Sequence, residues 1–436
     1  MKWILYNVLF AIAYFAMLPH FLWRMKRRGG YRDRFADRFG RYPRDVAAAL
    51  AGMHGKAIWV HAVSVGEVGV AGQLMRALRE KDPSLRFVLS TTSSTGWAQA
   101  RRTAGPDDVA IYYPVDFPRC VRRALDAVRP RAVVLAESEI WPNFIRAARR
   151  RGIPLFLANA RVSDRSAPRY KALRWFFGEI FRSFSRIYAQ SRTDAERLEA
   201  AGADGAAIEV AGSFKFDGAR RDPAKEKEVR AWLGSGGPLL LGGSTWPGED
   251  EVLLRIYASL RGETPGLKLA IVPRHFEKAD AVEANIRAAG FECIRRSRGD
   301  AAPEDGAAGP GAVFLADTTG ELSGFYGCAD VAFVGKSLCA HGSQNMIEPC
   351  LCGAATVVGP YTENFRPVMR ELLAAGAIVQ AGDEAGVARE TARLLKDADA
   401  RRALGRRAAQ AVESLRGASG RCAASMLAIM GGGATA

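Results

Sequence analysis

The feature that most constrains this chain is a repeated alternation between short apolar segments and segments with helical spacing. Apolar, strand-forming runs separated by helical runs are typical of parallel sheets whose two faces are both covered by helices. The chain contains two such series, so the sequence predicts an α/β fold with two doubly wound, Rossmann-like domains. The expected strands cover 57–65, 85–91, 109–113, 131–136, 154–159 and 186–190 in the first series, and 238–242, 267–272, 312–316, 330–335 and 354–359 in the second.

The length of the chain and a polar break in its middle give the expected domain limits. A chain of 436 residues exceeds the roughly 250–300 residues at which single cores stop growing. We expect a first domain at 26–217, a polar, helical linker at 218–237 and a second domain at 238–436, with the two domains facing one cleft. The Ala/Arg/Leu-rich segment from Glu384 either closes the second domain or crosses back to the first. Gly, Pro, Asp and Ala dominate 296–311, which predicts a surface loop.

The N-terminal segment 1–25 has the composition of a membrane anchor. Residues 3–23 contain no acidic residue and no lysine or arginine, and they match the roughly 20 residues that span a bilayer. Trp3 and Trp23 lie near the two ends, as interfacial aromatic residues do, and an arginine-rich stretch follows at 24–38. This pattern predicts a single-pass anchor in the cell inner membrane, with the rest of the chain on the cytoplasmic side. A cleaved signal peptide fits less well, because no small-residue cleavage site follows; a buried amphipathic helix is the other alternative.

The charge of the chain restricts its partners. Sixty-two basic residues against 46 acidic ones give a formal net charge of +16, which favours anionic lipid headgroups or phosphorylated substrates. No nucleic-acid-binding motif accompanies the charge, so we do not expect nucleic acid as a partner. The seven cysteines and five histidines are too dispersed to predict a metal site, and an odd number of cysteines without a framework is typical of reduced thiols in the cytoplasm.

Four candidate residues of the first domain lie at strand ends of the predicted sheet. Glu67 lies at a strand–turn–helix junction, where a carboxylate is either a partner of the helix N-terminus or a catalytic base. Glu137 and Glu139 follow the strand at 131–136, and helix capping would explain one of them but not both. Lys215, between two phenylalanines, is either a solvated edge residue or a ligand for phosphate or carboxylate.

The second domain carries candidate residues at corresponding positions. Ser244 and Thr245 belong to a Gly-rich stretch that opens a helix, and such backbone is suited to phosphate. Arg274 ends the next strand and could hold two oxygens of the same phosphate. Asn345 and Glu348 have capping-box spacing, although a carboxylate there could instead bind the hydroxyls of a ribose.

Several motifs occur together in an order that resembles one known family. The motifs are HAVSVGE, AESEIWPN, LANARVSDRS, GSFKFD, GSTWPGED, PRH, DTTGEL, the segment 345–349 and GPYTENF. They resemble the bacterial 3-deoxy-D-manno-octulosonate (Kdo) transferases of lipopolysaccharide synthesis. The resemblance implies the GT-B glycosyltransferase fold, CMP-Kdo as donor, a lipid A precursor (lipid IVA) at the inner face of the cytoplasmic membrane as acceptor, and no metal or other cofactor.

The resemblance also implies roles for individual residues. Glu67 matches the family's general base, and Glu137 and Lys215 match residues that stabilise the transition state. Direct displacement with one base predicts inversion at the Kdo anomeric carbon. The segments that match those binding CMP are Pro273-Arg274, Thr319-Gly320-Glu321 and Asn345-Met346-Ile347-Glu348.

The sequence departs from the commonest family pattern at two places. Gly342-Ser343-Gln344-Asn345 stands where Gly-Gly-His-Asn is common, and Gly335-Lys336-Ser337-Leu338 where Gly-Gly-Ser-Leu is common. Gln344 can still donate and accept hydrogen bonds, so we expect nucleotide binding to be retained, whereas Lys336 adds a cation. The rival interpretations are another membrane-associated GT-B glycosyltransferase, a sugar-nucleotide epimerase, and a non-catalytic nucleotide-binding protein.

Overall fold

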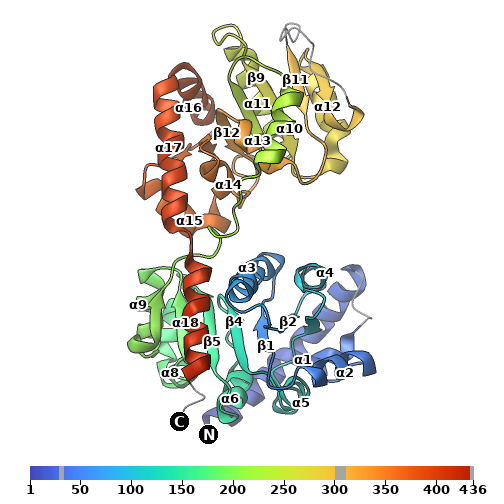
Figure 1. Cartoon of the computed structure of the whole chain (residues 1–436), viewed down its shortest axis with the longest axis vertical. Helices are drawn as coiled ribbons and strands as arrows, with labels where there is room; N and C mark the ends of the chain where they lie inside the picture. The colour runs from blue at the N-terminus through green and yellow to red at the C-terminus, as the bar shows by residue number, and fades with distance from the viewer. Residues whose placement is uncertain (29–33, 300–310, 433–436) are drawn as a thin grey trace. The chain divides into compact units, whose positions relative to one another are not determined.

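The computed structural model describes residues 1–28, 34–299 and 311–432, which divide into two compact units (Figure 1). Unit 1 comprises Met1–Gly218 together with Gly417–Ala436, and unit 2 comprises Ala219–Arg416. Each unit contains one parallel sheet of seven strands with helices on both faces. The expected α/β fold with two doubly wound domains is therefore confirmed.

The sheet of unit 1 has the strand order β3-β2-β1-β4-β5-β6-β7, and every neighbouring pair is parallel. The chain begins the sheet in its middle and winds outward in both directions, as doubly wound folds do. Its strands are β1 (Ile58–His61), β2 (Phe87–Thr91), β3 (Val109–Tyr112), β4 (Ala132–Ala136), β5 (Leu155–Ala160), β6 (Arg186–Ala189) and β7 (Ile208–Val210).

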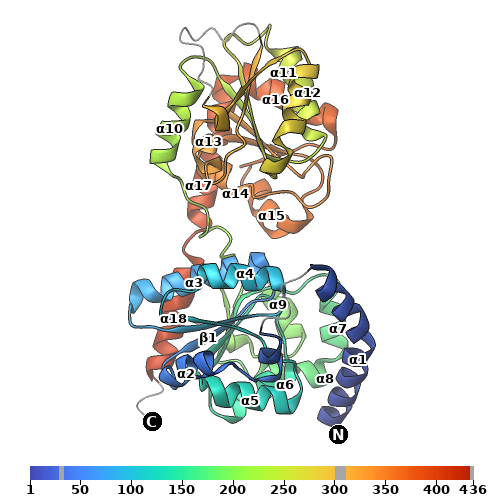
Figure 2. The ribbon, with the colours of Figure 1, turned by 90° about the vertical axis from the view of Figure 1, so that its right-hand side faces the viewer.

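Helices bury both faces of this sheet, which explains why its strands are continuously apolar. In β1, Trp59 belongs to one core, while Ile58 and Val60 belong to the core on the opposite face. Figure 2 shows α3 and α4 on one side of the sheet and α5 and α6 on the other. The helices of unit 1 are α1 (Lys2–Arg28), α2 (Arg44–Gly52), α3 (Val65–Lys81), α4 (Ser94–Thr103), α5 (Pro118–Val128), α6 (Pro142–Arg150), α7 (Ala167–Ala172), α8 (Arg174–Phe181), α9 (Arg192–Ala200) and α18 (Ala418–Gly432), with the short 3-10 helices η1 (Phe35–Phe39) and η2 (Gly205–Ala207).

Unit 2 repeats this architecture with the strand order β10-β11-β9-β8-β12-β13-β14. Its strands are β8 (Leu239–Thr245), β9 (Lys268–Pro273), β10 (Glu292–Arg295), β11 (Ala312–Leu315), β12 (Val331–Val334), β13 (Ala355–Val358) and β14 (Val379–Gln380). Its helices are α10 (Pro223–Leu233), α11 (Glu249–Leu260), α12 (Ala279–Ala288), α13 (Leu322–Cys328), α14 (Ile347–Leu351), α15 (Arg366–Ala374), α16 (Glu384–Lys396) and α17 (Ala398–Leu415), with η3 (Phe276–Lys278), η4 (Arg296–Arg298) and η5 (Glu363–Phe365).

Two expected segment limits are wrong, each for a local reason. The strand expected at 57–65 ends at His61, because Ser64 caps α3 and the helix starts at Val65. The strand expected at 238–242 continues to Thr245. Its glycines therefore do not form a phosphate loop; a side chain at Gly243 would collide with the Tyr326 hydroxyl.

The domain limits differ from the expected ones at both crossings. The segment 218–237 is not a free linker, since α10 within it packs against α13 of unit 2 and buries Val229. The second domain does not extend to 436, because α18 returns to unit 1 and packs beside α3. Of the expected loop at 296–311, residues 300–310 lie outside the described part of the chain.

The N-terminal helix α1 lies along unit 1 rather than apart from it (Figure 2). The Tyr6 hydroxyl donates to Asp116 at 2.8 Å, and Phe10 packs edge-on against Phe117. The opposite side of α1 exposes large apolar side chains, including Ile4 and Ile12. By length and composition, Lys2–Trp23 is long and apolar enough to cross a membrane, so α1 is compatible with an anchor. Residues 29–33 of the basic flank lie outside the described chain.

Candidate active site

Glu67 is held in a capping box at the N-terminus of α3, just beyond the end of β1. The Ser64 hydroxyl accepts from the Glu67 amide at 3.2 Å, as the N-cap of the helix, and it donates to Glu67 Oε1 at 3.0 Å. The Val63 amide donates to Glu67 Oε2 at 2.8 Å. Glu67 is therefore a partner of the helix N-terminus, but each of its carboxylate oxygens keeps a second lone pair that can accept a hydrogen bond from an incoming hydroxyl.

Glu137 follows β4 on the same sheet edge and has a strained backbone. Its φ of 55° lies in the left-handed region, where a side chain other than Gly or Asn is costly and which clusters at functional sites. The Asn159 side-chain amide donates to Glu137 Oε1 at 3.2 Å, and Asn159 Oδ1 accepts from the Phe214 amide. Burial raises the pKa of Glu137, while the positive charge of Lys215 lowers it.

Lys215 lies in the loop that follows β7 and completes the cluster. Burial lowers the pKa of Lys215, whereas the carboxylates of Glu137 and Glu67 raise it. The neighbouring Glu67 in turn raises the pKa of Glu137. The three residues expected from separate motifs are therefore electrostatic neighbours at the carboxyl edge of the unit 1 sheet.

Neither glutamate of the AESE segment caps α6, contrary to the capping interpretation of one of them. Asp116, from the loop after β3, accepts from the Asn143 and Phe144 amides at 2.9 Å and fills that position. Glu139 instead accepts from the Trp141 indole and lies 3.8 Å from His61 Nε2.

In unit 2 the candidate residues at the ends of β8 and β9 are adjacent. Thr245 pairs with Pro273 in the sheet, and the Arg274 amide donates to the Thr245 carbonyl. Arg274 itself is exposed, whereas Ser244 and Thr245 are nearly buried.

The glycines at 242 and 243 belong to strand β8 rather than to a loop, and acidic residues follow at the start of α11. The first turn of α11 carries the acidic residues Glu249, Asp250 and Glu251, which already satisfy the positive end of that helix. A phosphate at this helix end would meet like charge, so the hydroxyls of Ser244 and Thr245 are the favoured candidate donors there.

The other two expected donor-site segments are locally ordered. Glu321 is paired with Arg296 at 2.7 Å and accepts from the Thr318 hydroxyl, while Thr319 and Gly320 are exposed. The two segments occupy different strand ends of unit 2, after β11 and after β12 respectively.

At the second of these segments, Asn345 and Glu348 form a local hydrogen-bonded pair. Asn345 Oδ1 accepts from the Ile347 amide at 3.0 Å, and its amide group donates to Glu348 at 3.1 Å. Burial raises the pKa of Glu348. Met346 and Ile347 are buried and anchor the segment in the core.

Sequence reasoning missed Glu249, whose buried carboxylate organises the loop after β12. It accepts from the Trp246 amide and from the amides of Lys336, Ser337 and Leu338 at 2.8–3.1 Å. The Lys336 ammonium lies 5.0 Å from the centre of the Trp246 ring. In the sequence, the only sign of this role is the Trp-Pro-Gly-Glu segment at 246–249, which places Glu249 as an acidic residue in the first turn of a helix.

Two further features bear on the site chemistry. Asn159 was also missed as a site residue, although it lies at the carboxyl end of an apolar strand, the position that singled out Glu137. Within residues 1–28, 34–299 and 311–432, no group of three or more His, Cys, Asp or Glu residues is arranged to hold a metal ion.

Comparison with known proteins identifies the family. Residues 33–218 match the family described as 3-Deoxy-D-manno-octulosonic-acid transferase (kdotransferase). The 3-deoxy-D-manno-octulosonic acid transferase of Bordetella pertussis is 39% identical over 377 residues, covering 83% of this chain and 84% of that protein. The enzyme of the same name from Haemophilus influenzae is 32% identical over 391 residues, covering 89% of each.

A solved structure supports the architecture independently of sequence. A glycosyltransferase from Rickettsia africae matches with a TM-score of 0.56 at 12% identity, covering 86% of this chain and 98% of that one. At that identity the likeness shows the fold alone, which is the fold of GT-B glycosyltransferases. The family match and the two curated relatives decide the rest: the chain belongs to the 3-deoxy-D-manno-octulosonic acid transferase family.

Proposed function

We propose that this chain transfers Kdo from CMP-Kdo to a lipid A precursor, with inversion at the Kdo anomeric carbon and without a metal or cofactor. Family membership supports the Kdo transfer. The observation that carries the mechanism is the cluster of Glu67, Glu137 and Lys215 at the carboxyl edge of the unit 1 sheet. Ligands bind at that edge in open α/β sheets.

Glu67 is the proposed general base. A sugar hydroxyl of the acceptor is a poor nucleophile until its proton is removed, and a positioned base contributes typically 10²–10⁴-fold. The acceptor oxygen forms a bond to the Kdo anomeric carbon, the proton passes to Glu67, and the bond from that carbon to the phosphate oxygen breaks. CMP leaves with the bonding electrons. The hydrogen bonds from Val63 and Ser64 support this role, because they fix the carboxylate in one orientation.

Lys215 and Glu137 are proposed to stabilise the transition state. The Kdo carbon becomes oxocarbenium-like while the departing phosphate gains negative charge, so a cation and an anion are both needed. Lys215 would stabilise the leaving phosphate or the Kdo carboxylate. Glu137 would balance the oxocarbenium charge and keep Lys215 protonated, which fits the direction in which its charge moves the pKa of Lys215.

Unit 2 is the proposed CMP-binding half. The exposed guanidinium of Arg274 would hold the phosphate, with Pro273 shaping that strand end and Ser244 and Thr245 as additional hydroxyl donors. The pair of Asn345 and Glu348 would bind the ribose hydroxyls. The other residues of these two segments are proposed to contribute to CMP binding through their backbone and through the fixed conformation of their loops. They are Met346, Ile347, Thr319, Gly320 and Glu321.

We further propose that α1 attaches the chain to the inner membrane, with both units on the cytoplasmic side. There the anionic lipids of the membrane would contact the basic surface of the chain. Crossing the bilayer as a single-pass helix would separate α1 from unit 1 and break the hydrogen bond between Tyr6 and Asp116. Attachment through the exposed apolar side of α1 keeps those contacts. The docked helix therefore favours insertion alongside the membrane surface over a full crossing.

The test of the function is direct. The purified chain is incubated with CMP-Kdo and a tetraacylated lipid A precursor, and the lipid is analysed by mass spectrometry. The proposal predicts a mass increase of one or more Kdo units that depends on CMP-Kdo. No added Kdo, under conditions in which a control transferase works, would contradict it.

A further inference from the structure

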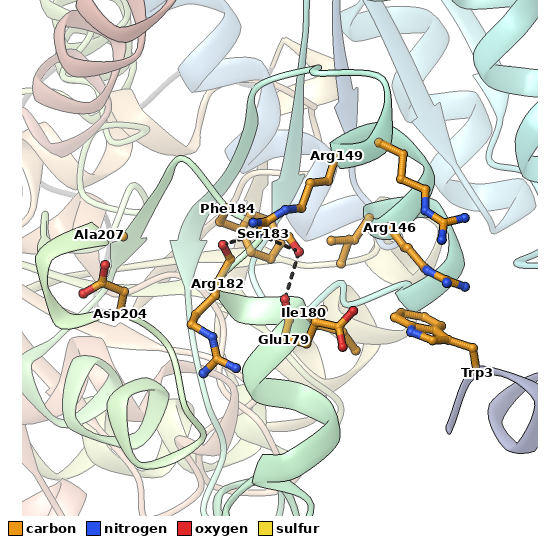
Figure 3. Close-up of a pocket in the computed structure, with 12 residues that line it drawn as sticks. Trp3, Arg146, Arg149, Glu179, Ile180, Arg182, Ser183, Phe184, Asp204 and Ala207 are labelled. Carbon is orange, nitrogen blue, oxygen red and sulfur yellow. Dashed lines mark hydrogen bonds between the residues drawn. The ribbon is translucent and has the colours of Figure 1, made fainter. Parts of the chain in front are cut away.

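A cavity of about 600 Å³ opens on unit 1 beside the N-terminal end of α1 (Figure 3). It is lined by the last turn of α6, the end of α8 and the loop before β7. Because α6 runs from the carboxyl end of β4 to the amino end of β5, its last turn lies at the sheet edge opposite Glu67 and Glu137. The cavity is therefore separate from the proposed catalytic cluster.

Four arginines line the cavity against two carboxylates. Arg149 donates to the Arg182 carbonyl at 2.6 Å, and Arg182 donates to the Gly202 carbonyl at 3.0 Å. These bonds fix the guanidiniums without neutralising them, because a carbonyl carries no net charge. In the described part of the chain, none of the four lies within salt-bridge distance of a carboxylate; the four are Arg146, Arg149, Arg150 and Arg182.

The carboxylates of the cavity supply only part of the missing negative charge, because Glu179, which attracts Arg146, is shared with Lys2. Glu179 is paired with Lys2 of α1, and Asp204 is exposed. Burial and the positive charge of Arg150 lower the pKa of Arg146, and the negative charge of Glu179 offsets this only in part. A cluster of fixed cations that repel one another is stabilised by an anion, and several guanidiniums around one space match the oxygens of a phosphate.

The surroundings of the cavity indicate which kind of molecule would carry such a phosphate. The Arg146 guanidinium lies 4.2 Å from the centre of the Trp3 ring, and Trp3 packs on Phe176. Figure 3 shows Trp3 beside Arg146 at one side of the cavity. From there the exposed apolar side of α1 continues through Ile4 and Val8, and Trp175 of α8 is exposed as well. Cations next to an exposed apolar stripe are typical of a surface that meets lipid headgroups and acyl chains together.

We propose that this cavity binds the phosphate headgroup of an anionic phospholipid while the exposed side of α1 enters the acyl region. The site uses neither the donor nor the acceptor, so it goes beyond the proposed reaction. It would fix the orientation of unit 1 on the membrane.

The test is flotation of the full chain with vesicles of phosphatidylglycerol and phosphatidylcholine, mixed one to three. The Arg149→Gln/Arg150→Gln variant should bind roughly 30-fold more weakly, since each arginine near such a surface contributes about fivefold in affinity. The charge-matched control is Arg389→Gln/Arg406→Gln, two exposed arginines of unit 2. The control should change binding by less than about threefold, and all variants should bind equally to phosphatidylcholine alone.

A second variant and a phosphate titration separate the headgroup site from a general charge effect and from a site for a soluble anion. Arg150→Glu, which replaces an exposed side chain, should reproduce the loss without lowering the melting temperature. Equal losses in the cavity and control variants would show a general charge effect and overturn the proposal. Saturable binding of inorganic phosphate that requires Arg149 and Arg150, without any effect on vesicle binding, would assign the cavity to a soluble ligand instead.

The final arm separates the lipid site from the acceptor site. In lipid-free detergent micelles, the cavity variants should keep the wild-type KM for the lipid acceptor. A raised KM there would make the cavity part of the acceptor site and overturn the proposal. Flotation needs no donor, acceptor or turnover, so its outcome is independent of whether Kdo transfer is observed.

Discussion

At the scale of residues, Glu137 and Lys215 control one another's charge. Burial disfavours the charged form of both, and their mutual attraction offsets this effect in part. Because burial is the larger effect on Lys215, its pKa lies below that of an ordinary lysine. If Lys215 acts as a cation, kcat should fall on the alkaline side at a pH below the ordinary lysine value of about 10.4.

Removing the charge of Glu137 should shift the pKa of Lys215 in a known direction. Glu137 raises the pKa of Lys215, so Glu137→Gln should move the alkaline limb of the kcat profile to still lower pH. Lys215→Ala should remove that limb and lower kcat by roughly 10²–10³-fold. The measurement is kcat against pH with saturating donor. An alkaline limb that stays in place in Glu137→Gln would show that Lys215 is not the titrating group.

Residues at strand ends could be located from the sequence, whereas their partners could not. Glu67 and Glu137 each follow an apolar strand, whereas Lys215 follows the short, partly polar β7, and parallel strands bring their carboxyl ends to one edge. Asn159 also lies at the end of a strand, but its hydrogen bonds join Glu137 to Phe214, far away in sequence. Asp116 caps a helix that begins 26 residues later, and no local pattern marks such a contact.

At the scale of elements, Glu249 joins the start of α11 to the loop that follows β12. Its buried carboxylate accepts from the backbone amides at 336–338, and leaving buried donors unpaired is costly. Glu249→Gln should lower the stability of unit 2 by roughly 2–4 kcal/mol and weaken CMP binding, because the loop loses its fixed conformation. Chemical denaturation and CMP titration measure the two effects.

The matched control is Glu251→Gln, an exposed acid in the same turn of the same helix. It removes the same charge and should cost less than about 1 kcal/mol. Similar losses in both variants would mean that helix charge, rather than the loop contacts, stabilises this region.

Long apolar elements were predictable, and short or interrupted ones were not. The strand at 132–136 is fully apolar between turn residues and was located within one residue. The edge strands Ile208–Val210, Glu292–Arg295 and Val379–Gln380 are short and partly polar, so they lack a periodic signal. The end of β1 was misjudged because Ala62 and Val63 remain apolar, although Ser64 and Glu67 carry the capping-box spacing.

At the scale of the whole molecule, the chain crosses between its units twice. The second crossing returns α18 to unit 1, where Cys422 and Met426 are buried in the core that includes Leu74 of α3. The sequence permitted this crossing but did not specify it, because an Ala-rich apolar helix can complete either core. Whether α18 completes the core of unit 1 or that of unit 2 is decided by where its buried face packs, which the structure shows and the sequence does not.

A core substitution in α18 tests this assignment. Met426→Ala should destabilise unit 1 by about 2–5 kcal/mol, through lost burial and the cavity left behind. Ala424→Ser, at an exposed position of the same helix, should have little effect. Hydrogen exchange followed peptide by peptide should show the loss of protection in β1 and α3 and leave β8 and β12 unchanged. Loss confined to unit 2 peptides would contradict the assignment.

The central claim is that Glu67 removes the proton from the acceptor hydroxyl, and one pair of variants tests it most directly. Glu67→Gln keeps the size of the side chain and its acceptor oxygen for the capping box but cannot take up a proton. Glu80→Gln removes the same charge from an exposed position on the same helix. With CMP-Kdo and the lipid A precursor, Glu67→Gln should lose roughly 10²–10⁴-fold in kcat while binding CMP as the wild type does, and Glu80→Gln should keep full activity. Turnover of Glu67→Gln near the wild-type rate would contradict the claim.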